Sequence, residues 1–170
     1  NLEDLYVGVM GNAKSLLEHG LTDKRSRIPD GMDDARFAAK IITRQGTERV
    51  ARFSCELAMK RRKKLTVSAK TNMLPATDRY FCQIARSVAQ GYPELKYEEY
   101  IIDDMASRLV QSPEDLDVLL LPNLYGDILS DEAAATIGGL GLAPSGCYGD
   151  DFAYFESAHG TAPDLTGENK

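Results

Sequence analysis

The chain has 170 residues, of which 43% are hydrophobic and 27% charged, the composition of a globular domain with a core of its own. Its net charge of −6 includes no basic excess, which argues against nucleic acid as a partner. Three widely spaced cysteines, Cys55, Cys82 and Cys147, form no CxxC motif and predict reduced thiols in an intracellular protein. No signal peptide and no apolar run of transmembrane length is visible, so no membrane partner is expected.

The two ends of the sequence read as interior parts of a longer polypeptide. The chain begins with Asn1 and not with Met, and its first residues already resemble a motif. It ends at TGENK without a closing element. We therefore expect this chain to be part of a larger protein to which the complete function belongs.

The N-terminal third alternates between extended and irregular patterns. Leu2–Met10 alternates loosely and predicts a strand that ends near Gly11. The polar stretch Gly20–Asp34 predicts an irregular arm, and Ile41–Thr43 a short strand. A helix is expected over Gly46–Lys60, with Val50, Phe53 and Leu57 spaced at the helical period on one face.

The basic run Lys60–Lys64 (KRRKK) lies at the predicted C-terminal end of that helix, where positive charge is favourable. No aromatic residues interleave with the run. A solvated basic turn is therefore a better interpretation than a nucleic-acid site.

Two strands and one helix are predicted in the middle of the chain. Leu65–Ala69 is expected to be a strand, and Pro75 to open a helix whose inner face carries Phe81, Ile84 and Val88. The sequence Gly91-Tyr92-Pro93 is expected to end this helix. The second strand is Tyr97–Ile102.

The C-terminal part continues the alternation of helix and strand. A short helix carrying Met105 and Leu109 precedes a buried strand at Asp117–Leu121. A helix over Asp127–Ile137 follows, and a turn-rich tail completes the chain. Strands and helices that alternate along a chain indicate an α/β fold.

Several polar side chains follow predicted strands, and two of them form an unusual pair. In NLYGDILSD, Asp127 and Asp131 lie four residues apart, where like charges on a helix repel. Asp103, Lys70 and Asn72 follow other strands and are expected at the same edge of the sheet. Three carboxylates favour a hard cation, Mg²⁺ or Mn²⁺, over zinc.

Each of these side chains also has a simpler interpretation. Asp127 is of a type that commonly serves as a helix N-cap, Asp131 fits a solvated helix surface, and Lys70 fits an exposed strand end. Taken singly, each simpler interpretation is favoured. Spacing alone therefore supports a metal-binding α/β domain only as one hypothesis.

Longer motifs add a family resemblance that covers essentially the whole chain. The strings NLYGDILSD, GGLGLAPS and HGTAPDLTG, in this order, resemble the β-decarboxylating dehydrogenases, and so do NLEDLYVG, ITRQGTERVARF and AKTN. This family includes isocitrate, homoisocitrate, 3-isopropylmalate and tartrate/D-malate dehydrogenases. Its members oxidise a 2-hydroxy acid with NAD or NADP and then release the β-carboxylate as CO₂.

The resemblance assigns roles to individual residues. It implies that Asp103, Asp127 and Asp131 bind the metal, and that Lys70 is the catalytic lysine, which works with Tyr6. In the family the lysine and the third aspartate come from the partner subunit, so a homodimer with shared active sites is implied. Asp104 lies beside Asp103, but alignment back from Ser112-Pro113 favours Asp103.

The resemblance also implies a cofactor site made largely by the C-terminal loop. Its expected members, in chain order, are Asn72, Glu156, His159, Gly160, Thr161, Ala162 and Asp164. A carboxylate at Asp164 accepts the ribose hydroxyls of NAD and repels the extra phosphate of NADP. Members that use NADP often carry Lys and Tyr where this chain has Asp164 and Leu165, so NAD is predicted.

The implied fold is the small, dimer-forming domain of the isocitrate/isopropylmalate dehydrogenase fold. Residues 1–155 would form that domain, with a dimerisation arm at about 12–42, and residues 156–170 would begin a cofactor loop of the large domain. The rest of the large domain is not in the chain, so the isolated fragment is expected to be inactive. The implied compartment is the cytoplasm, or the mitochondrial matrix in a eukaryote.

The opening NLEDLYVG favours isocitrate as substrate, with homoisocitrate next. Leu2, where Ser or Thr is usual, and Ala69, where His is often found, depart from that pattern. Isopropylmalate and tartrate/D-malate therefore stay open as alternatives. A non-catalytic regulatory subunit of isocitrate dehydrogenase is the alternative of another class, and the presence of Tyr6, Lys70 and the three aspartates argues against it.

Overall fold

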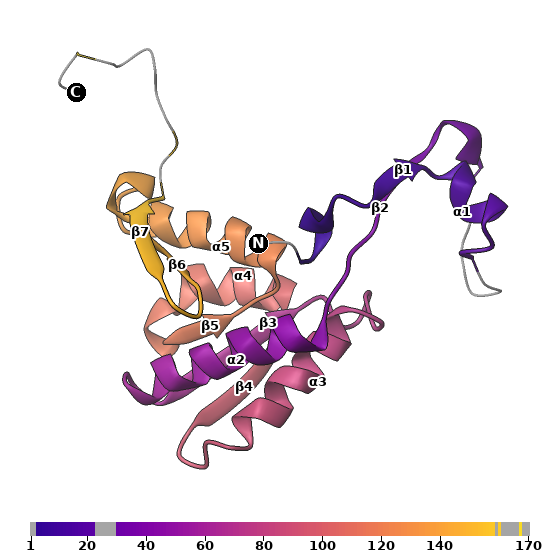
Figure 1. Ribbon diagram of the computed structural model, residues 1–170. Helices are drawn as coiled ribbons and strands as arrows, with labels where there is room; N and C mark the ends of the chain where they lie inside the picture. Colours follow the sequence, from indigo (N-terminus) through magenta and orange to yellow (C-terminus); the bar gives the residue numbers. More distant parts are fainter. Residues whose placement is uncertain (1–2, 23–29, 159, 161–166, 168–170) are drawn as a thin grey trace.

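A parallel sheet of three strands forms the centre of the computed structural model, which describes residues 3–22, 30–158, 160 and 167 (Figure 1). The strand order is β4-β3-β5. The strands are β3 (Lys64–Ala69), β4 (Lys96–Ile101) and β5 (Val118–Leu120). All three agree within one residue at either end with the predicted strands.

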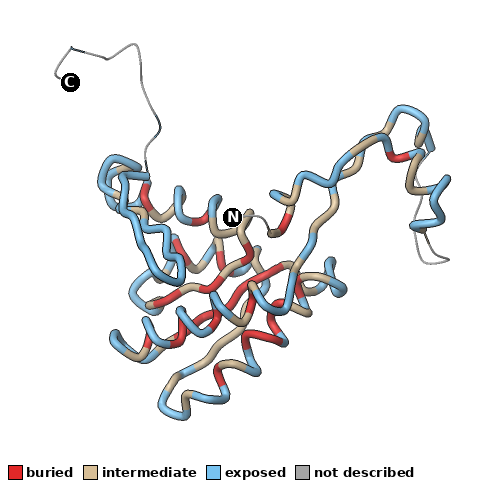
Figure 2. Tube along the Cα trace, viewed as in Figure 1, coloured by how far each residue is buried: buried red, intermediate tan, exposed pale blue. Residues whose placement is uncertain are grey.

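Helices cover both faces of this sheet, as Figure 1 shows. The helices are α2 (Arg44–Met59), α3 (Asp78–Ala89), α4 (Ile102–Gln111) and α5 (Asn123–Thr136). The first two pack with Leu65, Val67 and Ala69 of β3 in one core, and the last two contribute Met105, Leu109 and Leu129 to another. Most of the buried residues therefore lie between the sheet and its helices (Figure 2), and the predicted α/β class is confirmed.

Two helix starts differ from the predictions by three or more residues, whereas α2 begins two residues before the predicted Gly46. Helix α3 begins at Asp78 and not at Pro75, because residues 71–77 form turns and Asp78 is buried. Its inner face is as predicted, with Phe81 and Ile84 buried. Helix α5 begins at Asn123 with Pro122 as its N-cap, so Asp127 lies more than a turn inside it. The N-cap interpretation of Asp127 is therefore wrong.

Helix α2 buries a different face from the one that its large apolar residues predicted. Val50, Phe53 and Leu57 are each 40% exposed. The buried residues of the helix are small or weakly polar: Thr47, Ala51, Ser54, Cys55 and Ala58. Small side chains let the helix approach the sheet and α3 closely, so the large residues point away from the core.

The predicted strand Leu2–Met10 is not formed by the described residues. A 3₁₀ turn occupies Leu5–Val7, and left-handed backbone at Asp4 (φ 65°) and Gly8 (φ 73°) interrupts any extended run. Ile41, predicted to begin a short strand, makes only an isolated bridge with Asp4.

An antiparallel ribbon flanks the stretch Gly20–Asp34, which was predicted to be irregular, and projects from the body of the molecule (Figure 1). Strand β1 (Met10–Asn12) pairs with β2 (Arg36–Ala38). Between them lie α1 (Lys14–Glu18) and a 3₁₀ turn at Met32–Asp34. Short elements held by pairing between distant segments leave little periodic signal in the sequence.

The tail, predicted to be rich in turns, forms a second antiparallel ribbon. Strand β6 (Pro144–Tyr148) pairs with β7 (Ala153–Ser157), and short 3₁₀ turns lie at Pro113–Asp115 and Leu140–Leu142. Gly and Ser are weak strand formers, which is why β6 has little strand signal of its own.

No helix among the described residues is long and apolar enough to cross a membrane.

The basic residues that follow α2 form ion pairs and hydrogen bonds with acidic residues elsewhere in the chain. Arg61 Nε lies 2.7 Å from Asp117 Oδ1, and the Arg62 backbone N–H donates to Asp117 Oδ2 at 2.9 Å. Lys63 pairs with Glu94 and Lys64 with Glu98. These positive charges are paired with acidic partners, while the side chains of Arg61, Arg62 and Lys63 stay about half exposed.

We expect Asp117→Asn to destabilise the protein by about 1–2 kcal/mol at neutral pH, because it weakens charge-assisted hydrogen bonds to Arg61 and Arg62. Burial alone would raise the pKa of Asp117, but those hydrogen bonds outweigh burial and hold the pKa below its ordinary value. Since the folded pKa is lowered, this stability is present above the unfolded pKa of about 3.9 and is lost as the pH falls through the folded pKa.

Urea denaturation at pH 7 and at pH 3 measures this difference. The control is Glu48→Gln, which removes an exposed pair with Arg44 and should cost no more than about 0.5 kcal/mol. An Asp117→Asn variant as stable as wild type at pH 7 would contradict the prediction.

Candidate active site

The residues predicted to act together lie after the parallel strands, at the carboxyl edge of the sheet. Lys70 directly follows β3, and Asp103 lies in the first turn of α4, after β4. Helix α5, which carries Asp127 and Asp131, follows β5. Groups from distant parts of the chain converge at this edge of an open α/β sheet, as the sequence predicts.

Lys70 and Asp103 form an ion pair between Nζ and Oδ2. The hydrogen bond from Lys70 lowers the pKa of the Asp103 carboxyl. The neighbouring Asp104 points elsewhere, with its carboxylate 2.8 Å from Arg108 Nε one helical turn away. Geometry therefore distinguishes the two adjacent acids, and only Asp103 of the two pairs with the lysine.

Tyr6 and Asp127 form a second pair, although 121 residues separate them in the sequence. The Tyr6 hydroxyl donates a hydrogen bond to Asp127 Oδ2. This bond, together with the negative charge of the carboxylate, raises the pKa of Tyr6. The phenol therefore keeps its proton at neutral pH and is available as a donor.

A cleft of about 430 Å³ lies beside Asp127. Its lining residues come from α5, from the β6–β7 ribbon and from the segment after it: Asp127, Ser130, Asp131, Ser145, Glu156, Ser157, Ala158 and Gly160. The structure thus brings two predicted metal ligands together with Glu156 and Gly160, which were predicted to bind the cofactor.

Sequence reasoning missed the three serines of this cleft. Ser130 lies inside the NLYGDILSD motif, so its position beside both aspartates was a usable signal. Ser145 and Ser157 belong to the β6–β7 ribbon, and without that pairing nothing in the sequence places them near α5.

The aspartates of α5 fit a divalent cation. Among the described residues, no side chain donates a hydrogen bond to Asp131 or forms an ion pair with it, and its like-charged neighbour Asp127 lies on the same helix face. Carboxylate oxygens at the edge of a polar cleft suit Mg²⁺ or Mn²⁺. Within the described residues, no group of three Asp, Glu, His or Cys side chains lies close enough together to hold a metal ion. Asp103 therefore does not join Asp127 and Asp131 inside one chain.

The remaining cofactor residues are only partly located. Asn72 is exposed in the turn that follows Lys70. His159, Thr161, Ala162 and Asp164 lie outside the described residues. Their assignment to a cofactor site stays a prediction.

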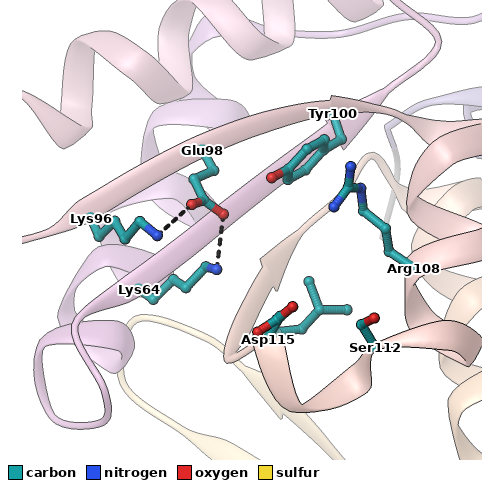
Figure 3. A pocket seen from close by; sticks show the side chains of 8 residues that line it. Lys64, Lys96, Glu98, Tyr100, Arg108, Ser112 and Asp115 are labelled. Carbon is teal, nitrogen blue, oxygen red and sulfur yellow. Dashed lines mark ion pairs between the residues drawn. The ribbon is translucent and has the colours of Figure 1, made fainter.

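A second cleft, of about 230 Å³, lies at the opposite end of the sheet and contains none of the predicted site residues (Figure 3). Lys64 and Lys96 flank Glu98 at 3.0 and 2.8 Å, and Arg108 lies 4.1 Å from the centre of the Tyr100 ring. Because these charges already satisfy one another, this cleft is poorly suited to capture an anion.

Comparisons with known proteins agree with this arrangement. The sequence profile described as isocitrate/isopropylmalate dehydrogenase matches residues 1–170. The homoisocitrate dehydrogenase of Methanocaldococcus jannaschii is 42% identical over 169 residues, which are 99% of this chain and 43% of that protein. A mitochondrial regulatory subunit of NAD isocitrate dehydrogenase from Dictyostelium discoideum is 47% identical over 133 residues, 77% of this chain and 38% of that protein.

A solved structure extends the match to three dimensions. The crystal structure of isocitrate dehydrogenase from Methylococcus capsulatus aligns with a TM-score of 0.81 and 36% identity, covering 98% of this chain and 45% of that one. The chain therefore spans less than half the length of these relatives. On its motifs, its fold and these matches, the chain belongs to the isocitrate/isopropylmalate dehydrogenase family.

Proposed function

We propose that the full-length protein containing this chain catalyses metal-dependent oxidative decarboxylation of a 2-hydroxy acid, isocitrate first, with hydride transfer to NAD. The observation that carries this proposal is the cleft beside α5. There Asp127 and Asp131 share one space with Glu156, and Tyr6 is hydrogen-bonded to Asp127.

The residues divide the proton transfers between them. Lys70, as the neutral amine once Asp103 turns to the metal, would take the proton of the substrate hydroxyl, and Tyr6 would give a proton to the carbon that loses CO₂. The raised pKa of Tyr6 means only that the phenol carries its proton at neutral pH. Asp103, contributed by the partner subunit, would hold Mg²⁺ or Mn²⁺ together with Asp127 and Asp131, and the ion would supply charge stabilisation for the carbonyl and the enolate.

NAD is the proposed cofactor because the carboxylate of Asp164, which lies outside the described residues, would accept the ribose hydroxyls. The names of several relatives support the same choice, since they include NAD isocitrate dehydrogenase subunits. Glu156 and Gly160, which line the cleft beside α5, would lie at the start of the cofactor loop of the large domain.

We further propose a homodimer with shared active sites, in which residues 1–155 form the small domain. Asp103 pairs with Lys70 and does not meet Asp127 and Asp131 within the described part of one chain, so a partner subunit is required to complete the metal site. Two large apolar side chains are exposed, Val110 on α4 at 58% and Ile137 just after α5 at 61%. Their exposure supports a subunit interface that includes these two positions. The proposed compartment is the cytoplasm, or the mitochondrial matrix in a eukaryote.

The proposed activity is tested by NADH formation with the full-length protein and Mg²⁺. Isocitrate, homoisocitrate, 3-isopropylmalate and D-malate are compared, each with NAD and with NADP. We expect isocitrate to have the highest kcat/KM and NAD to be preferred over NADP. A strong preference for another of these acids would reassign the substrate within the family.

A regulatory subunit is the second candidate function, favoured by one observation: a relative with that role in its name is 47% identical over 133 residues. Tyr6, Lys70 and the three aspartates argue for catalysis, because a subunit without catalysis has no need to keep them. Absence of activity on all four acids, with Mn²⁺ still bound, would support the regulatory role.

A further inference from the structure

A buried lysine lies between two buried carboxylates beneath the candidate active site. Lys40 Nζ is 2.6 Å from Asp78 Oδ1 and 3.4 Å from Asp4 Oδ1, and it lies 4.3 Å from the centre of the Tyr125 ring. The Lys40 side chain is 11% exposed, and those of Asp4 and Asp78 are 1% and 0% exposed. Asp4 and Tyr125 lie in the motifs NLEDLYVG and NLYGDILSD, but the sequence assigns none of these four residues a role, and they come from separate segments of the chain.

Each carboxylate uses its second oxygen to hold a backbone segment of the site. Asp78 Oδ2 accepts the backbone N–H of Lys70 at 2.8 Å and the hydroxyl of Tyr125 at 2.9 Å. Asp4 Oδ2 accepts the backbone N–H of Leu124, at the start of α5, at 3.1 Å.

The network therefore reaches both pairs of candidate catalytic residues. Asp78 fixes the backbone of Lys70 itself, and Leu124 precedes Asp127 by less than one helical turn. Asp4 precedes Tyr6 by two residues, and its backbone pairs with Ile41, directly after Lys40. One ammonium group thus ties together the segments that carry Tyr6, Lys70 and Asp127.

We infer that Lys40 is a positioning residue, whose charge holds Asp4 and Asp78 and so keeps Lys70 and the N-terminal turn of α5 in place, each in the active site to which it contributes. Two buried carboxylates without this cation would be uncompensated charges and would repel each other. Asp4 also has a positive φ of 65°, which a residue with a side chain keeps only when its surroundings hold it. The catalytic part of this inference rests on the proposed function.

The test is Lys40→Met in the full-length protein, read by kinetics and by hydrogen exchange. We expect kcat to fall about 10–100-fold, because small misplacements of catalytic groups are costly, while the KM for NAD changes less than about twofold. The amides of Lys70 and Leu124 should exchange at least about tenfold faster, with Val67 in β3 unchanged. Lys96→Met, which removes an exposed lysine paired with Glu98, is the control and should change none of these quantities.

Tyr125→Phe is the milder second variant, for use if Lys40→Met does not fold. It removes one hydrogen bond to Asp78 and should speed exchange at Lys70 and lower kcat about two- to fivefold. Unchanged exchange at Lys70, unchanged kcat, or faster exchange that includes Val67 would overturn the inference. If wild type oxidises none of the four hydroxy acids, the proposed function fails, and hydrogen exchange still decides whether Lys40 holds these segments.

Discussion

Lys70→Met in the full-length protein is expected to lower turnover by about 10²–10⁴-fold while Mg²⁺ still binds. Methionine has a similar length but no group that takes a proton, so the substrate hydroxyl loses its base. Asp103 loses its ion pair with Lys70, and its pKa rises back toward the ordinary value of 3.8. At pH 7 it stays ionised, which is why the metal site should survive.

Steady-state kinetics and Mn²⁺ titration followed by electron paramagnetic resonance measure the two effects. Lys63→Met is the control, because Lys63 also pairs with an acid, Glu94, but at an exposed turn. Wild-type turnover in Lys70→Met would refute the assignment of the base. Loss of Mn²⁺ binding in the same variant would instead give Lys70 a role in building the metal site.

Asp127→Asn is expected to weaken Mn²⁺ binding by about 100-fold or more and to abolish turnover at ordinary metal concentrations, because the site loses a charged oxygen ligand. In the metal-free protein the pKa of Tyr6 should fall toward its ordinary value of 10.0, since the carboxylate that raises it is gone. The ¹³Cζ chemical shift of Tyr6 measured against pH reports that change.

The control for Asp127→Asn is Asp150→Asn, which removes an exposed aspartate 3.9 Å from Arg49. It should leave Mn²⁺ affinity and turnover unchanged. Mn²⁺ affinity unchanged in Asp127→Asn would remove Asp127 from the metal site.

Mixing the two inactive variants tests whether active sites are shared. In a heterodimer of Lys70→Met and Asp127→Asn subunits, one site holds both substitutions and the other holds neither. After subunit exchange, activity should recover to about a quarter of wild type, because about half of the dimers are mixed and one of their two sites is intact. No recovery, with exchange verified by mass spectrometry, would place the complete site within one subunit.

The sequence by itself determined the α/β class, the three parallel strands and the residue types of the site. Strands β3 and β5 were predictable because apolar runs bounded by turn residues act locally, and β4 because its Tyr and Ile residues favour strands. The motif around Asp127 and Asp131 placed two acids on one helix face by helical spacing alone. The sequence also indicated the family, because several long motifs occur in it in a fixed order.

Only the tertiary structure decided which distant residues meet. Tyr6 lies against Asp127 across 121 residues and Lys70 pairs with Asp103 across 33, and no local pattern encodes either contact. Helix α2 shows the same limit of sequence-based prediction. Its buried face carries the small residues that fit against the sheet and α3, and not its largest apolar residues. Lys40 is the strongest case: its buried charge has a role only because the fold brings Asp4 and Asp78 to either side of it.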